Sequence, residues 1–197
     1  MRLAPRMVRR LPKIARNAVR DLRYGGFLGG TVKTRYGHLG AHDVGNVEYE
    51  DLPPLFEPAN VQPDDVIVDV GAGKGRSINW LLERYPENRI VGIELDPEIA
   101  TKTAKRLRRF PNVTIVAGDA TELLPPDGTV FYLFNPFDAS VMRRFIDAFA
   151  ADGMHPQRRI VYHNCKDVEL FRADPRFDVR EITLPSGSFR AALVTLR

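Results

Sequence analysis

The sequence of 197 residues predicts an α/β fold built on a mostly parallel sheet. Five short apolar runs alternate with segments of helical character between residues 66 and 172. Such alternation is typical of a parallel sheet with right-handed crossovers. A last pair of strands flanks Pro185-Ser186-Gly187, and a turn this short makes its two strands antiparallel. We therefore expect one antiparallel strand at the C-terminal end of the sheet.

The expected strands are residues 66–70, 89–95, 113–117, 129–134 and 159–163, and the terminal hairpin adds residues 177–184 and 188–196. Helices are expected at residues 76–85, after Asp96-Pro97, at residues 139–151 and at residues 168–172. The first strand reads Val-Ile-Val-Asp-Val, and β-branched residues are enriched in strands. Asp96 followed by Pro97 predicts a helix start, because aspartate caps free amides and proline suits the first helical position.

Residues 1–24 differ in charge from the rest of the chain. They hold eight of the 29 basic residues and one of the 25 acidic residues, so they carry a net +7 and the remainder carries −3. Apolar residues recur through them at helical spacing, which predicts an amphipathic arm; these are Leu3, Met7, Leu11, Ile14, Ala18 and Leu22. Pro12 is expected to begin the helix and Gly25-Gly26 to end it.

Three roles fit this basic arm. It could be a solvated or docked helix, a membrane-surface helix attracted to anionic lipid, or a contact for RNA or another acidic partner. No apolar run is long enough for a transmembrane segment, and no continuous apolar region suggests a secretory signal peptide. The single cysteine, Cys165, excludes an internal disulfide. We expect a cytoplasmic protein that could associate peripherally with a membrane.

Residues 25–60 connect the arm to the regular part of the chain. Residues 25–46 are rich in glycine and aromatic residues and lack periodicity, which predicts a loop or lid. Residues 47–60 indicate a short helical stretch that Pro53 and Pro54 break. The regular pattern then continues, so residues 61–197 are expected to form the main domain.

A glycine-rich loop, Gly-Ala-Gly-Lys-Gly-Arg at residues 71–76, follows the first strand and precedes a helix. Glycine lets the backbone approach a ligand closely. A dinucleotide fingerprint needs a third glycine or alanine where this chain has Arg76, and the spacing of a phosphate-binding P-loop is also absent. A nicotinamide-dependent oxidoreductase is therefore disfavoured.

Polar residues follow the next three strands. Glu94 ends the second strand, Asp119 follows the third, and Asn135-Pro136-Phe137 follows the fourth. Open α/β sheets bind ligands at this edge. Glu94 could accept hydrogen bonds from both hydroxyls of a ribose there, and Asp119 could accept one from an adenine amino group. His163 ends the fifth strand and could face a substrate or solvent.

Together these segments resemble the class I S-adenosylmethionine-dependent methyltransferase superfamily over about residues 61–197. The resemblance rests on VDVGAGKGR, VGIELD, AGDA, LFNPF and the terminal hairpin. It implies a three-layer Rossmann-like fold with a mostly parallel seven-stranded sheet and an antiparallel C-terminal strand. It also implies S-adenosyl-L-methionine as cofactor. No Cys/His cluster has metal-ligand spacing, so no metal is expected.

The resemblance also implies roles for residues by position. The cofactor-binding residues would be Asp69, Gly71, Ala72, Gly73, Gly75, Glu94, Leu95, Asp119 and Ala120. Within this set the glycine loop would shape the methionine end of the pocket, Glu94 would hold the ribose, and Asp119 with Ala120 would address the adenine. Asn135, Pro136 and Phe137 would line the methyl-transfer site.

The expected activity is methylation of nitrogen in a protein side chain or a small amine. Amine methyltransferases of the superfamily often carry Asn-Pro-Pro-aromatic at this position, whereas Asn135-Pro136-Phe137 has a single proline, so the motif does not support an adenine- or glutamine-modifying role. The GKGR loop is similar to that of non-SET lysine methyltransferases. RNA methylation, with the arm as the RNA-binding element, and a cofactor-binding module without activity are the alternatives.

Overall fold

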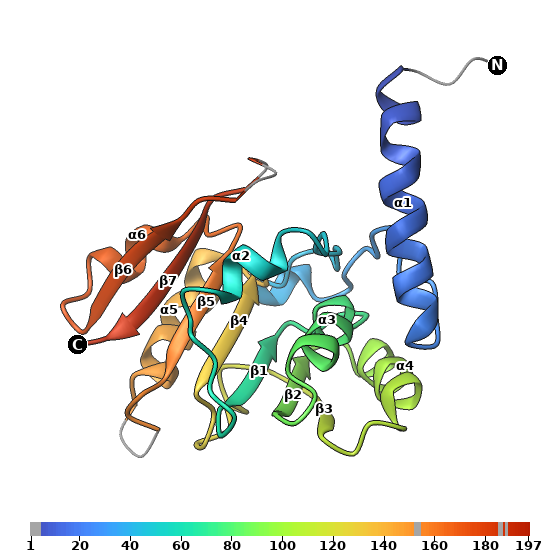
Figure 1. Cartoon of the computed structure of the whole chain (residues 1–197). Coiled ribbons are helices and arrows are strands. Elements are labelled where there is room, and N and C mark those ends of the chain that lie inside the picture. Colours follow the sequence, from blue (N-terminus) through green and yellow to red (C-terminus); the bar gives the residue numbers. More distant parts are fainter. Residues whose placement is uncertain (1–4, 152–154, 185–186, 188) are drawn as a thin grey trace.

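A seven-stranded mixed sheet forms the centre of the computed structural model, which describes residues 5–151, 155–184, 187 and 189–197 (Figure 1). Its strands are β1 Val66–Val70, β2 Arg89–Glu94, β3 Val113–Ala117, β4 Val130–Phe134, β5 Arg159–His163, β6 Phe177–Ile182 and β7 Ala191–Leu196. They lie in the order β3-β2-β1-β4-β5-β7-β6. β7 pairs antiparallel with β5 and β6, and the pairs from β3 to β5 are parallel. The expected α/β architecture is confirmed.

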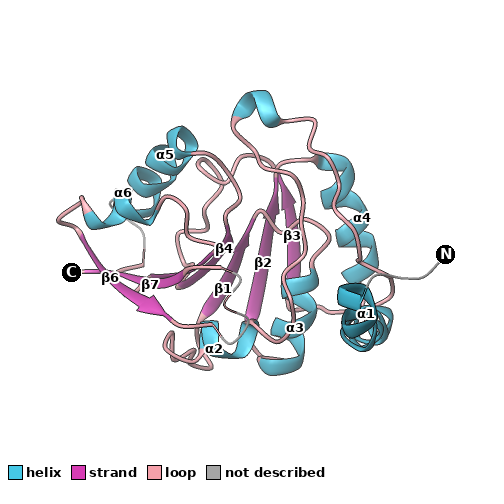
Figure 2. Ribbon diagram, turned by 90° about the horizontal axis from the view of Figure 1, so that it is seen from above, coloured by secondary structure: helices cyan, strands magenta, loops and turns pink. Residues whose placement is uncertain are grey.

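The described helices are α1 Pro5–Arg23, the 3-10 turn η1 Gly37–Leu39, α2 Leu52–Phe56, α3 Arg76–Arg84, α4 Pro97–Leu107, α5 Ala139–Phe149 and α6 Val168–Arg172. The sheet lies between them as the middle of three layers (Figure 2). α5 and α6 pack on one face and α2, α3 and α4 on the other, each over its own buried cluster. None of the described helices combines the length and the apolarity needed to cross a membrane.

Side-chain alternation along the central strands explains the two clusters. On β1, Val68 and Val70 belong to the α5 and α6 cluster, whereas Ile67 belongs to the α2, α3 and α4 cluster. Successive side chains of a strand point to opposite faces, so an apolar run covered on both faces buries nearly all its residues. β1 and β4 therefore lie at the centre of the core, and the strand order reverses between them.

Two helix boundaries differ from the sequence expectation. α1 begins at Pro5 rather than at Pro12. Proline fits the first position of a helix because the backbone amide there has no partner within the helix. Pro12 removes one backbone hydrogen-bond donor inside α1 but does not end the helix. In α2 the two prolines lie in the first turn, where backbone amides have no helical partner, so the expected break at Pro53 and Pro54 is wrong. Of the expected hairpin turn, residues 185, 186 and 188 lie outside the described residues.

The lid segment, residues 25–46, is a loop apart from η1, and it lines one cavity together with the C-terminal ends of β1 to β4. A β-bridge joins Val32 to Val44 within the lid, and another joins Ala41 to Phe137. The backbone amide of His42 donates to the carbonyl of Pro136 at 3.0 Å. Main-chain bonds thus attach the lid to the loop that follows β4.

Candidate active site

A cavity of about 430 Å³ opens at the C-terminal ends of β1 to β4. The remainder of its lining comes from residues 34 and 37–45 of the lid and from the start of α5. Among the residues singled out from the sequence, those that line it are Gly71, Glu94, Leu95, Asp119, Ala120, Asn135, Pro136 and Phe137. This is the point where the strand order reverses, which is the usual ligand site of open α/β sheets.

Glu94 fastens the glycine loop to the end of β2. Its Oε2 accepts a 2.7 Å hydrogen bond from the amide of Gly73, and its Oε1 accepts one of 2.9 Å from the amide of Asp96. The Glu94 residue is only 5% exposed, and burial raises the pKa of its carboxyl. Each carboxylate oxygen can accept a further bond, so Glu94 has acceptor capacity left at the cavity wall.

Two positions in the loop require glycine. Gly71 and Gly73 have φ values of +75° and +52°. A Cβ at Gly71 would lie 2.8 Å from Cβ of Pro136, and one at Gly73 would lie 2.6 Å from Cγ1 of Val44. The loop therefore packs directly against both the β4 loop and the lid. Gly73 itself does not line the cavity, and neither do Ala72 and Gly75.

Asp69 lies beneath the loop rather than in the cavity. It is 2% exposed and accepts a short hydrogen bond from the hydroxyl of Ser77. Together with Gly71, Ala72 and Gly75 it borders a separate space of about 30 Å³. Asp69 thus supports the loop from below.

Asp69 gives a prediction about pH. Burial raises the pKa of its carboxyl from 3.8 to about 7. Between these values the unfolded chain has lost a proton that the folded chain keeps, so the free energy of unfolding falls as the pH rises. The Asp69→Asn variant has no such proton, and its free energy of unfolding should rise relative to the wild type across this window. Urea denaturation of both proteins at several pH values measures the free energy of unfolding. Parallel pH curves for the variant and the wild type would contradict the prediction.

Asp119 and Ala120 lie at the edge of the cavity beyond β3. Oδ1 of Asp119 accepts a 2.8 Å hydrogen bond from the amide of Thr121, and its Oδ2 lies 3.6 Å from the guanidinium of Arg144. The Asp119 side chain is 32% exposed, whereas Ala120 is 9% exposed as a residue. Asp119 therefore offers an acceptor that solvent or a ligand can reach.

Asn135 lines the cavity and has an unused acceptor. Its φ of +43° is a left-handed conformation that asparagine tolerates better than most residues. Its Oδ1 is buried and has no hydrogen-bond partner among the described residues. Nδ1 of His42 lies 2.9 Å from the backbone carbonyl oxygen of Asn135 and 3.0 Å from Nδ2 of Asn135. The lid thus contacts Asn135 but leaves Oδ1 without a hydrogen-bond partner in the described part of the chain.

The neighbours of Asn135 are less exposed. Phe137 is 7% exposed and packs against Phe145, with ring centroids 5.6 Å apart. Pro136 contacts the glycine loop, as described above. Both line the cavity and hold the shape of its wall.

The described charged residues that line the cavity are mostly acidic. They comprise four carboxylates, Asp43, Glu94, Asp119 and Asp138, and the guanidinium of Arg144. Backbone amides hold the pKa of Asp43 and of Asp138 below the ordinary value, with the amides of Thr34 and Val141 as the main donors. Both exposed carboxylates are ionised at neutral pH, and Nζ of Lys33, 3.5 Å from Oδ2 of Asp43, offsets only part of the negative charge. The cavity lining therefore favours a cation.

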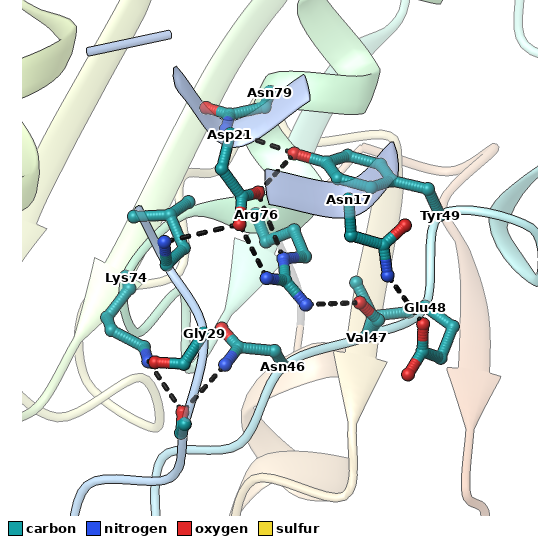
Figure 3. Close-up of polar contacts among 12 residues, drawn as sticks. Asn17, Asp21, Gly29, Asn46, Val47, Glu48, Tyr49, Lys74, Arg76 and Asn79 are labelled. Carbon is teal, nitrogen blue, oxygen red and sulfur yellow. Dashed lines mark hydrogen bonds and ion pairs between the residues drawn. The ribbon is translucent and has the colours of Figure 1, made fainter. Parts of the chain in front are cut away.

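An ion pair that the sequence did not reveal connects α1 to the glycine loop (Figure 3). Arg76, at the start of α3, donates through Nη2 to Oδ2 of Asp21 at 2.6 Å and through Nε to Oδ1 at 3.1 Å. Asp21 is fully buried, and Oδ1 also accepts from the hydroxyl of Tyr49 at 2.8 Å. The only signal was that Asp21 is the single acidic residue of the arm.

The lid is tied to the same loop. Nζ of Lys74 donates to the carbonyls of Gly29 and Gly30 at 2.9 and 2.6 Å, and Nδ2 of Asn46 donates to Gly30 at 2.7 Å (Figure 3). Arm, lid and glycine loop are therefore connected by polar contacts.

His163 does not have either of the surroundings expected from the sequence. It is fully buried, it is not part of the cavity lining, and its ring stacks on Phe134 with centroids 4.5 Å apart. Burial lowers the pKa of its imidazole to about 4. The packing of β5 against β4 and β7 explains why this strand end is covered.

Comparisons with known proteins agree with this geometry. A family model described as a methyltransferase domain matches residues 67–151. The chain is 34% identical over 77 residues to a tRNA (guanine-N(7)-)-methyltransferase of Brevibacillus brevis, which covers 36% of this chain and 36% of that protein. It is 30% identical over 136 residues to a trans-aconitate 2-methyltransferase of Sinorhizobium fredii, which covers 60% of this chain and 51% of that protein.

Among solved structures, an RNA methyltransferase from Salinibacter ruber in complex with S-adenosyl-L-homocysteine aligns with a TM-score of 0.56. The identity is 25%, and the alignment covers 74% of this chain and 89% of that one. The chain spans between about a third and a half of the length of the two curated relatives.

Proposed function

Because the chain belongs to the class I S-adenosylmethionine-dependent methyltransferase superfamily, we propose that it transfers the methyl group of S-adenosyl-L-methionine to the nitrogen of an amine. The acceptor is a protein side chain or a small amine. The observation that carries this proposal is the buried, unpartnered Oδ1 of Asn135 at the cavity.

The residues at the cavity fit S-adenosyl-L-methionine. A volume of about 430 Å³ lies within the usual range of small-molecule sites. Glu94 would accept the ribose hydroxyls, and Asp119 with Ala120 would contact the adenine. The turn at Gly71 would lie against the methionine end, because it borders the cavity next to Pro136.

The chain's own residues position the acceptor. When bound, S-adenosyl-L-methionine supplies a methyl group that its positively charged sulfur already activates. Oδ1 of Asn135 would accept a hydrogen bond from the amine and so direct the nitrogen lone pair toward that methyl group. A cationic amine must release one proton to solvent before its nitrogen can attack. The lid, held by the Ala41–Phe137 bridge, would limit the access of water.

The charge at the cavity mouth supports an amine acceptor. Asp138, and Asp43 in part because Lys33 pairs with it, carry negative charge there, which attracts an ammonium group and repels a phosphate or a carboxylate. A lysine side chain or a small amine therefore enters more favourably than an RNA backbone does.

RNA methylation is the second candidate. It is favoured by the names of two similar proteins, a tRNA methyltransferase and an RNA methyltransferase. Exposed basic residues in and just after α4, including Lys105 and Arg108, could contact RNA phosphates outside the cavity.

Transfer of labelled methyl into a cell extract tests the acceptor class. The full chain is incubated with labelled S-adenosyl-L-methionine and extract, and the products are treated with protease or with nuclease. Label released by protease, or label already in the small-molecule fraction as a methylated amine, supports the proposal. Label released by nuclease overturns it in favour of RNA.

Glu94 provides a test of the cofactor site. Glu94→Gln removes a charged acceptor, and we expect the affinity for S-adenosyl-L-homocysteine to fall about thirtyfold, or about 2 kcal/mol. Calorimetric titration measures the change. The matched control is Glu87→Gln, an exposed residue at the opposite end of β2, which should bind as the wild type does. Equal affinity in the Glu94 and Glu87 variants would show that Glu94 does not hold the ribose.

A further inference from the structure

α1 is docked to the domain by its polar side, as its described side chains show. Nζ of Lys13 lies 2.6 Å from Glu50, and Nδ2 of Asn17 donates to Glu48 at 2.7 Å. Further along, Arg20 pairs with Glu83 on α3, and Asp21 pairs with Arg76. These contacts fix the helix beside the domain, while its N-terminal half extends away from the sheet layers (Figure 1).

The apolar side of α1 faces solvent. Ile14, Val19 and Leu22 are 50%, 56% and 61% exposed, and Ala15 lies exposed between them. A surface helix normally buries such a stripe against its own domain. The arrangement is reversed in α1, so the stripe is left for contact with something outside the domain.

A basic hollow lies next to the last turn of α1. Its volume is about 520 Å³, and all its lining residues are basic: Lys102, Lys105, Arg106, Arg108 and Arg109. Arg106 and Arg109 donate to the carbonyls of Tyr24 and Arg23, which places the hollow at the C-terminal end of α1. α1 and α4 lie side by side in Figure 2. The apolar stripe and the cationic hollow therefore occupy neighbouring positions.

We propose that the exposed side of α1 and the basic hollow at the C-terminal end of α4 form a surface that binds an anionic membrane. The apolar side chains would enter the boundary between headgroups and acyl chains, and the hollow would face lipid phosphates. Exposed Arg16 and Arg23 add positive charge to the same helix, and the sequence of residues 1–12 continues the apolar spacing and adds four arginines.

A membrane fits this surface better than the other occupants do. RNA would use the cationic groups but has no use for exposed Ile14, Val19 and Leu22. A second copy of the chain would bring two strongly basic arms together and would meet electrostatic repulsion. An anionic lipid surface satisfies both the charge and the apolar stripe. This proposal does not depend on the identity of the methyl acceptor.

Sedimentation of the full chain with vesicles tests the proposal. The vesicles contain phosphatidylcholine alone or phosphatidylcholine mixed with anionic phosphatidylglycerol. We expect binding to the anionic vesicles only, and binding that weakens as salt is added. The Lys105→Gln/Arg108→Gln variant should bind roughly fivefold more weakly for each charge removed. The control Arg143→Gln, an exposed residue on α5 at the other side of the sheet, should bind like the wild type.

A second variant isolates the apolar stripe. Val19→Asn/Leu22→Asn leaves the net charge unchanged and should weaken vesicle binding at least about tenfold. Unchanged binding of this variant would overturn the proposal. Two other results would also overturn the proposal. In the first, the chain does not bind vesicles but binds an RNA oligonucleotide. In the second, the chain does not bind vesicles and forms a dimer that is lost in the Val19→Asn/Leu22→Asn variant.

Discussion

Replacing Asn135 with glycine is expected to lower methyl transfer by about 10²- to 10³-fold, the usual effect of removing one oriented polar group from an active site. The substitution removes Oδ1, the unpartnered acceptor at the cavity, and glycine accepts the φ of +43° without strain. Affinity for S-adenosyl-L-homocysteine should stay unchanged, because Glu94 and Asp119 remain in place. Transfer of labelled methyl into a cell extract measures the activity, and calorimetric titration measures the affinity for S-adenosyl-L-homocysteine.

The chain offers a matched control for this substitution. Asn60 has a similar φ of +47° and lies exposed in the loop before β1, away from the cavity. Asn60→Gly should change neither transfer nor cofactor affinity. Full activity in Asn135→Gly would contradict the role assigned to Oδ1 of the Asn135 side chain.

Removal of the Asp21 carboxylate should give the largest loss of stability. Asp21→Ala leaves the guanidinium of Arg76 buried, 8% exposed in the side chain, without its partner. Breaking a buried ion pair in this way costs about 3–5 kcal/mol of the free energy of unfolding. Urea denaturation measures the loss. The affinity for S-adenosyl-L-homocysteine should fall as well, because Arg76 is the last residue of the glycine-rich loop.

Two comparisons separate this effect from a general cost of mutation. Asp178→Ala removes an exposed partner of Arg197, and its cost should stay at or below about 1 kcal/mol. The double variant Asp21→Ala/Arg76→Leu should recover part of the stability, because no unpaired charge remains buried. If Asp21→Ala costs no more than Asp178→Ala, α1 is not fastened to the domain by this pair.

The sheet and the strand-end residues could be predicted because their signals are local. β-branched runs mark the strands, and the ends of parallel strands meet at one edge, so Glu94, Asp119 and Asn135 converge on one cavity. The role of Asp69 in supporting the loop could not be predicted in this way. Strand alternation turns its side chain toward α3, where it meets Ser77 instead of the cavity.

The lid and the arm depend on contacts between distant parts of the chain. His42 and Asn135 are 93 residues apart, and Asp21 and Arg76 are 55 apart. No periodic pattern encodes such pairs. The amphipathic pattern of α1 was visible in the sequence. Which side of α1 packs against the domain depends on residues in other parts of the chain, namely Glu48, Glu50, Glu83 and Arg76.

Calorimetric titration of the full chain with S-adenosyl-L-homocysteine and, separately, with NAD tests the cofactor site most directly. The geometry predicts saturable binding of S-adenosyl-L-homocysteine at a single site and no binding of NAD, because Arg76 replaces the glycine that a pyrophosphate needs at the helix start. Binding of NAD without binding of S-adenosyl-L-homocysteine would contradict the assignment of Glu94, Asp119 and Gly71 to a nucleoside sulfonium.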